Sequence, residues 1–144
     1  MALTLEGAGQ YSIHSYGPEG IVLVLPDGVE PLNPPHIDGT PARRLDTITG
    51  SFLITPDGLH RDWIAGGFEA LERNHFAELA ELTVDVVLLG TGARLRMPHP
   101  ALSAPLAEAG IGLEVMDTIA ACRTLNVLLS ENRRVAAGFL PLDD

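Results

Sequence analysis

The sequence predicts a domain of the α/β class, at the border with α+β, built on a mixed sheet. In the second half of the chain, short apolar runs typical of buried strands alternate with segments of helical periodicity. Strands linked by helices of this length pair in parallel, through right-handed crossovers. In the first half, strand-like runs are separated by short turns, which favour antiparallel pairing. We therefore expect a C-terminal parallel β-α-β-α-β unit joined to N-terminal antiparallel strands.

The first half is predicted to contain strands, a hairpin and one long loop. Residues 11–16 alternate polar and apolar side chains, and residues 21–25 form a continuous apolar run that ends at a Pro-Asp-Gly turn. A cluster of prolines then predicts an irregular surface loop over about residues 29–45. Residues 52–55 and 59–63 flank a second Pro-Asp-Gly turn and are predicted to form a hairpin.

The second half is predicted to alternate helices and strands. The predicted elements are, in order, a helix over about 74–82, a strand over 84–89, a helix over 100–109, a strand over 112–116, a helix over 119–130 and a strand over 133–140. Asn74 and Asp117 are the predicted N-caps of the first and last helices. Pro100 suits the first position of the middle helix, and Gly110 suits its end.

Length and composition favour a single domain over residues 1–144 that can bury a sizeable core, with 46% hydrophobic residues. The formal net charge of -10 argues against nonspecific binding to nucleic acid or anionic membranes, because both need clustered cations. No apolar run approaches the roughly 20 residues of a membrane span. The opening MALTLEGAGQ lacks the basic start of a signal peptide, so a cytoplasmic location is predicted.

The residue inventory excludes several chemistries. All 9 basic residues are arginine, which rules out Schiff-base and P-loop chemistry by a lysine. A single cysteine excludes an intrachain disulfide and a cysteine-based zinc cluster. No His, Asp or Glu residues show the spacing of a metal motif, so neither a metal nor a cofactor is predicted.

The turn Gly90-Thr91-Gly92 follows a predicted strand, as the phosphate loops of nucleotide-binding proteins do. A dinucleotide fingerprint would need a third glycine where Leu95 stands, and a helix that begins at once. The helix is instead delayed to about Pro100. The sequence is therefore typical of a tight glycine turn, without a specific nucleotide motif.

A ligand site at this turn remains an alternative, because ligands collect beyond the carboxyl ends of parallel strands. Gly90, Thr91 and Gly92 follow one such strand end, and Asp117 and Thr118 follow the end of its predicted neighbour. With Arg94 and Arg96, these residues could line one crevice. Against this, the N-cap role alone explains Asp117, and its charge would repel an anion.

Cys122 has two interpretations. Its place near a helix N-terminus and beside Arg123 would lower the pKa of a thiol and favour a nucleophile, most plausibly paired with His99. It also lies at the margin of the apolar stripe, where a cysteine behaves as a small buried hydrophobe. With no catalytic constellation in the sequence, enzymatic activity stays uncertain and the balance is against it.

Arg123, Asn126 and Ser130 form a polar strip on the last predicted helix, away from its apolar side. The strip is either plain solvent-exposed surface or a contact face for another protein, since arginine beside aliphatic groups suits interfaces. The residues leave both interpretations open.

The runs VVLLGTG (86–92) and GIGLEVMDTIAACRTLNVLLSENRRVAAGFLPL (110–142) carry a family resemblance. They resemble the family of mitochondrial respiratory complex I assembly factor 3 and its small bacterial relatives, many of them described only as a domain of unknown function. Segments 51–59 and 13–21 extend the resemblance, and residues 29–49 depart from it with a longer connection. The resemblance implies a three-layer β/β/α fold and an assembly factor that acts through protein contacts. It provides no catalytic residues.

The leading hypothesis is therefore a non-enzymatic, assembly-factor-like protein that binds another protein. The alternative is a small-ligand binder or enzyme that uses the crevice at Gly90–Gly92 and Asp117. Self-association into a homo-oligomer is a third, weaker hypothesis.

Overall fold

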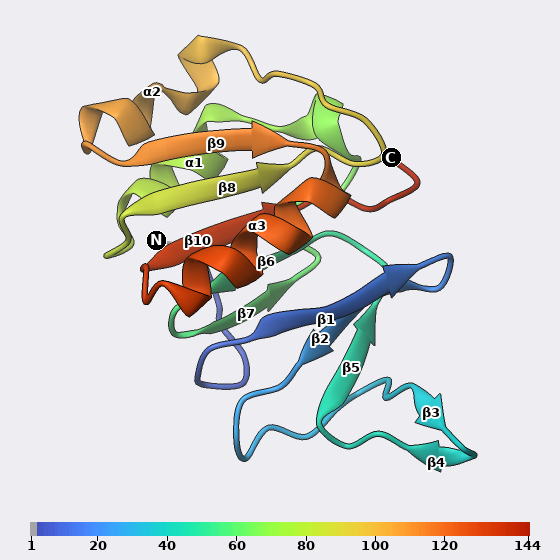
Figure 1. Ribbon diagram of the computed structural model, residues 1–144. Helices are drawn as coiled ribbons and strands as arrows, with labels where there is room; N and C mark the ends of the chain where they lie inside the picture. The colour runs from blue at the N-terminus through green and yellow to red at the C-terminus, as the bar shows by residue number, and fades with distance from the viewer. Residues whose placement is uncertain (1–2) are drawn as a thin grey trace.

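The computed structural model describes residues 3–144, which form a central sheet, a smaller sheet and covering helices (Figure 1). The central sheet has the strand order β7-β6-β10-β8-β9. Its strands are β6 (Phe52–Thr55), β7 (Gly58–Arg61), β8 (Val86–Gly90), β9 (Gly112–Met116) and β10 (Val135–Phe139). β10, β8 and β9 pair in parallel, whereas β6 and β7 join antiparallel. The predicted mixed sheet with a C-terminal parallel unit is confirmed.

The smaller sheet has the order β1-β2-β5 and is antiparallel throughout. Its strands are β1 (Ser12–Gly17), β2 (Gly20–Val24) and β5 (Leu45–Ile48). The sequence prediction missed β5, because only four residues follow the proline-rich segment before the next turn. That segment is also less irregular than predicted, since it contains a short hairpin of β3 (His36–Ile37) and β4 (Thr40–Pro41).

Helices cover both faces of the central sheet. On one face lie α1 (Arg73–Ala80), α2 (Pro100–Glu108) and the 3₁₀ turn η1 (Phe68–Ala70), and their apolar residues pack with the outward side chains of β8 and β10. On the other face lie α3 (Thr118–Ser130) and the smaller sheet, which share a second apolar cluster. This arrangement is the predicted three-layer β/β/α architecture, with α3 in the same layer as the smaller sheet.

The prediction that Asn74 caps the first helix is wrong. α1 begins one residue earlier, and Glu72 is its N-cap. The Glu72 and His75 side chains form a reciprocal capping box, in which His75 Nδ1 accepts from the Glu72 N–H at 2.9 Å. A histidine at this position takes the place usually held by Glu or Gln, which hides the motif from sequence inspection. Asn74 lies inside the helix and donates to Glu78 instead.

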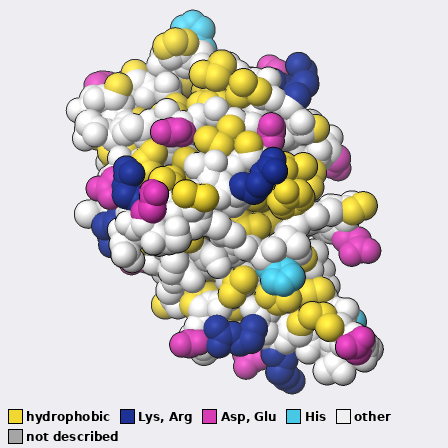
Figure 2. Space-filling model, in the orientation of Figure 1, with side chains coloured by type: hydrophobic (Ala, Val, Ile, Leu, Met, Phe, Trp, Pro, Cys, Tyr) yellow, Lys and Arg dark blue, Asp and Glu magenta, His cyan; other side chains and the backbone are white. Residues whose placement is uncertain are grey.

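The cap of α3 matches its prediction. Asp117 Oδ1 accepts a hydrogen bond from the Ala120 N–H at 2.8 Å, and Ala121, Cys122 and Leu125 are buried. Figure 2 shows that the molecular face that carries α3 exposes hydrophobic side chains beside arginine and acidic ones. Among residues 3–144, no helix is both long enough and apolar enough to cross a bilayer.

Candidate functional site

The turn after β8 packs directly against the start of α3. A Cβ added to Gly90 would lie 3.0 Å from Thr118 Cα and 3.1 Å from Ala121 Cβ. Contacts this short show that only glycine lets the helix approach so closely. The Gly90 carbonyl also accepts from the Leu140 N–H at 2.9 Å, which joins the turn to the end of β10.

Thr118 connects the three chain segments that meet here. Its hydroxyl donates to the Leu140 carbonyl at 2.7 Å and accepts from the Gly92 N–H at 2.8 Å. Its own N–H donates to the Gly92 carbonyl at 2.9 Å. Because Thr118 is fully buried, these bonds are shielded from water. The turn and the helix start are therefore neighbours, as expected, and direct hydrogen bonds join them.

Thr91 is engaged in the same way. Its N–H donates to the Met116 carbonyl at 2.9 Å, which continues the pairing of β8 with β9. Its hydroxyl donates to the Arg94 carbonyl at 2.7 Å and accepts from the Arg96 N–H at 3.1 Å. Thr91 therefore shapes the loop that follows, and its polar atoms already have partners within the chain.

Arg96 leads to a part of the site that the sequence did not reveal. Its Nη2 lies 3.0 Å from Asp144 Oδ2, and its guanidinium stacks over the Phe68 ring at 4.8 Å from the ring centroid. The Phe68 N–H donates to the same Asp144 oxygen at 2.9 Å. Phe68 and Asp144 are 76 positions apart, so no local pattern could have connected them.

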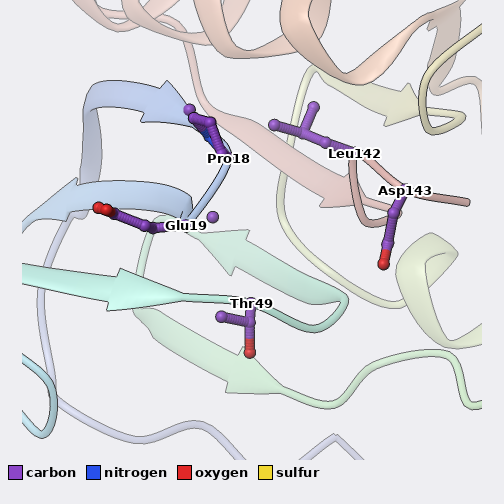
Figure 3. A pocket seen from close by; sticks show the side chains of 7 residues that line it. Pro18, Glu19, Thr49, Leu142 and Asp143 are labelled. Carbon is purple, nitrogen blue, oxygen red and sulfur yellow. The ribbon is translucent and has the colours of Figure 1, made fainter.

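Two cavities border the segment 141–144 on its two sides. The first, of about 310 Å³, lies between the β1–β2 turn, Thr49 and this segment, as Figure 3 shows for Pro18, Leu142 and Asp143. The second, of about 500 Å³, lies beside the carboxyl ends of β7 and β10 and the amino end of β6. It is lined by Gly50, Ser51, Asp62, Ile64, Ala65, Gly66, Gly67, Pro141, Asp143 and Asp144. Open space near the predicted site is therefore found on either side of residues 141–144.

Cys122 is placed in the core between α3 and the two sheets. Burial raises the pKa of its thiol to about 12, and the neighbouring Arg123 charge offsets this only in part. His99 cannot assist, because it caps α2 on the opposite face of the central sheet, where its Nδ1 accepts from the Ala101 N–H. The thiol is therefore protonated at neutral pH, which matches the interpretation as a small buried hydrophobe.

The polar strip on α3 divides into residues of different kinds. Asn126 accepts from the Ile13 N–H at 3.0 Å and donates to the Ile13 carbonyl at 2.8 Å, so it ties α3 to β1. The Ser130 hydroxyl donates to the Val127 carbonyl one turn back. Arg123 and Val127 are exposed, Val127 with 56% of its surface. Asn126 and Ser130 are exposed as well, so the whole strip faces solvent, and Val127 lies beside it.

Comparison with known proteins gives one family and several relatives. Residues 13–140 match the family described as "Protein of unknown function (DUF498/DUF598)". The chain is 35% identical over 138 residues to the zebrafish (Danio rerio) protein "NADH dehydrogenase (ubiquinone) 1 alpha subcomplex assembly factor 3", covering 94% of this chain and 67% of that protein. An uncharacterised Rhodobacter capsulatus protein is 44% identical over 59 residues, covering 41% of this chain and 48% of the relative. The match to the Xenopus tropicalis assembly factor covers 53% of that protein, so the chain spans about half to two thirds of these relatives.

Solved structures share the fold. A crystal structure of a Bordetella parapertussis protein has a TM-score of 0.70 at 25% identity and covers 94% of this chain and 99% of its own. A solution structure of a Bordetella pertussis protein, described as an Mth938-like domain, has a TM-score of 0.66 at 24% identity and covers 100% and 94%. These likenesses confirm the predicted fold class, and the sequence relatives confirm the resemblance.

Proposed function

Because this chain belongs to the DUF498/DUF598 family, and its relatives include a named assembly factor, we propose that it is an assembly-factor-like protein that works by binding another protein. The observation that carries the proposal is the similarity to the zebrafish assembly factor over 94% of the chain. The proposal includes self-association into a homo-oligomer as one form of this binding. A cytoplasmic location remains part of the proposal.

The solvent-facing strip on α3 supports a binding role. Arg123 and Val127 are exposed one helical turn apart, so their side chains lie on the same side of α3. Arginine is enriched at protein interfaces, and the exposed aliphatic side chain beside it adds apolar surface that a partner can bury. We therefore propose these residues, with Ser130, as the partner-binding face. Asn126 also bonds to Ile13 of β1, so a test of this face has to use residues other than Asn126.

The test is affinity capture from native lysate with the parent protein and with Arg123→Glu and Val127→Glu. Both changes place a negative charge on this exposed surface, so we expect recovery of a captured partner to fall at least tenfold. The matched control is Arg43→Glu, which makes the same charge change at an exposed site near β4. Recovery of no partner by the parent protein, or equal recovery by all variants, would contradict the proposal. Light scattering on the same samples reports self-association.

The alternative function is a small-ligand binder or enzyme that uses the Gly90–Gly92 turn and Asp117. The two cavities beside the adjoining segment 141–144 favour it. The internal hydrogen bonds of Thr91 and Thr118, and the burial of Cys122, count against a reactive site there. A thermal-shift screen with nucleotides and small organic acids separates the two proposals. A ligand present at 100 times its Kd should add about 2.7 kcal/mol of stability.

A further inference from the structure

The side chain of Asp144 is held as a bound carboxylate. Arg96 Nη2 lies 3.0 Å from Asp144 Oδ2, and the Phe68 N–H donates to the same oxygen at 2.9 Å. A guanidinium and a main-chain amide are donors that proteins use to bind carboxylates, because charge-assisted bonds of this kind are strong. The Arg96 and Asp144 side chains are largely buried, with 15% and 21% of their surfaces exposed.

The backbone around Asp144 is shaped to let this segment come close. Gly67 and Gly92 both have positive φ angles, of 76° and 97°. A Cβ on Gly67 would lie 2.5 Å from Asp144 Oδ1, and a Cβ on Gly92 would lie 2.9 Å from the Asp144 carbonyl oxygen. No other residue type would fit at either position without displacing Asp144. The two glycines, Arg96 and Phe68 form what we call the carboxylate cradle.

The cradle has binding capacity that Asp144 does not use. Arg96 Nη2 contacts Asp144 and also donates to the Thr91 carbonyl, whereas Arg96 Nε is buried without a hydrogen-bond partner within residues 3–144. The Nε–H and one Nη2–H of a guanidinium point the same way, as a fork that fits both oxygens of a carboxylate. Asp144 presents one oxygen to this fork. An unpaired buried donor is unfavourable, so a carboxylate free to rotate would bind Arg96 with better geometry.

We infer that the carboxylate cradle is a binding site for a carboxylate group, which the Asp144 side chain occupies from within the same chain. A carboxylate from a small organic acid, or from an acidic side chain of a partner, takes this place when residues 141–144 move aside. The cavities of about 310 and 500 Å³ on the two sides of the segment give the space for that exchange. This inference does not depend on the proposed assembly role.

Asp144 competes with any external carboxylate, because a short tether gives it an effective concentration in the millimolar range. Removing the competitor should therefore strengthen binding of a free carboxylate. The probe is sodium acetate, compared with sodium chloride at equal ionic strength, and the readout is the midpoint of thermal unfolding. We expect acetate to raise the midpoint of Asp144→Ala at concentrations at least about tenfold lower than for the parent protein.

Two variants show where the acetate acts. Glu114→Ala removes the same charge from an exposed residue of β9 that lines neither cavity, so its response should equal that of the parent. Arg96→Ala combined with Asp144→Ala removes the guanidinium and should abolish the response. If Asp144→Ala responds no more than the parent, or if the double variant keeps its response, the ion pair is purely structural and the inference is wrong.

Asp144→Asn provides a second test should the alanine variant fail to fold. It keeps the size of the side chain and an oxygen for the Phe68 N–H but removes the charge. Acetate should then shift the Phe68 amide resonance in this variant at lower concentrations than in the parent, and an unmoved resonance overturns the inference.

The peptides acetyl-Leu-Asp-Asp-amide and acetyl-Leu-Asn-Asn-amide distinguish the two sources of the carboxylate, a small organic acid and an acidic side chain of a partner. Binding of the acidic peptide at least tenfold tighter than acetate indicates a protein partner, and equal affinity indicates a small acid.

Discussion

Single residues around the glycine turn after β8 explain how this turn connects distant chain segments. Thr118 is the clearest case, because one hydroxyl donates to Leu140 and accepts from Gly92. Its burial means that water cannot replace either bond. Cys122, one turn further along α3, is buried with no comparable polar role. Thr118 thus joins three chain segments, whereas Cys122 packs in the core.

We predict that Thr118→Val destabilises the protein by roughly 2–4 kcal/mol. Valine preserves the shape of the side chain but leaves a buried carbonyl and a buried N–H unpaired, and each costs about 1–3 kcal/mol. Urea unfolding followed by circular dichroism measures the change. Thr124→Val on the same helix is the control, since Thr124 is only half-buried and should change stability by less than about 0.5 kcal/mol. A loss below 1 kcal/mol for Thr118→Val would show that the two hydrogen bonds of the Thr118 hydroxyl contribute little to stability.

The pKa of Cys122 predicts a pH dependence of stability. Burial raises this pKa from 9.0 to about 12. Between these values the unfolded chain loses the thiol proton while the folded protein keeps it, so the free energy of unfolding falls as pH rises. The loss approaches about 1.4 kcal/mol per pH unit and is absent below pH 9. Urea titrations at pH 8 and 10.5 should show a smaller drop for Cys122→Ala than for the parent. Identical drops would mean that the thiol ionises normally in the fold.

At the scale of elements, the contact between α3 and β1 holds the smaller sheet in place beside the helix that covers the central sheet. β1 is an edge strand of the smaller sheet, and its neighbour on the open side is α3 instead of another strand. Asn126 substitutes for that missing strand, because its amide bonds both the N–H and the carbonyl of Ile13. A side-chain amide has the same donor and acceptor as a peptide group, so it can complete a strand edge.

We predict that Asn126→Ala destabilises the protein by about 1–3 kcal/mol, since both polar groups of Ile13 lose their partner. Hydrogen exchange at the Ile13 amide should accelerate, while exchange in β10 follows only the global loss of stability. Arg123→Ala is the matched control on the same helix and should leave stability within about 0.5 kcal/mol. Unchanged protection of Ile13 in the asparagine variant would contradict the role assigned here.

At the scale of the whole molecule, an ionic network connects the smaller sheet to the central sheet. Arg61 at the end of β7 lies 2.6 Å from Asp46 of β5 and 2.6 Å from Glu6. Asp46 has only 1% of its side chain exposed, and its other oxygen accepts from the Asn33 N–H. A buried carboxylate needs such partners, so this network fixes how β5 lies against the hairpin β6–β7.

We predict that Arg61→Met costs about 3–5 kcal/mol, because it leaves the Asp46 charge buried without its cation. Replacing both residues, as Arg61→Met with Asp46→Leu, should recover most of that loss. Arg43→Met is the control, since its ion pair with Glu30 is exposed at both ends and contributes little. Guanidinium unfolding of the parent, Arg61→Met, Asp46→Leu and the double variant measures the coupling. Additive effects of the two changes would show that the residues do not interact.

The sequence alone determined the class of fold, the parallel order of the C-terminal unit and the Asp117 cap. These follow from hydrophobic periodicity and from short-range backbone chemistry, which act within a few residues. It also determined the family, through the run that ends in Gly90-Thr91-Gly92 and the run over residues 110–142. It missed β5 and misplaced the first helix cap, where four strand residues and a histidine gave weak local signals.

Only the tertiary structure decided which contacts the predicted site residues make. Contacts such as Thr118 with Leu140, Asn126 with Ile13 and Phe68 with Asp144 join positions 22, 113 and 76 apart, which no local pattern encodes. Burial, which sets the pKa of Cys122, likewise depends on segments brought together from the whole chain. The turn was visible in the sequence, but its neighbours and the carboxylate that lies beside it came from the packing of distant segments.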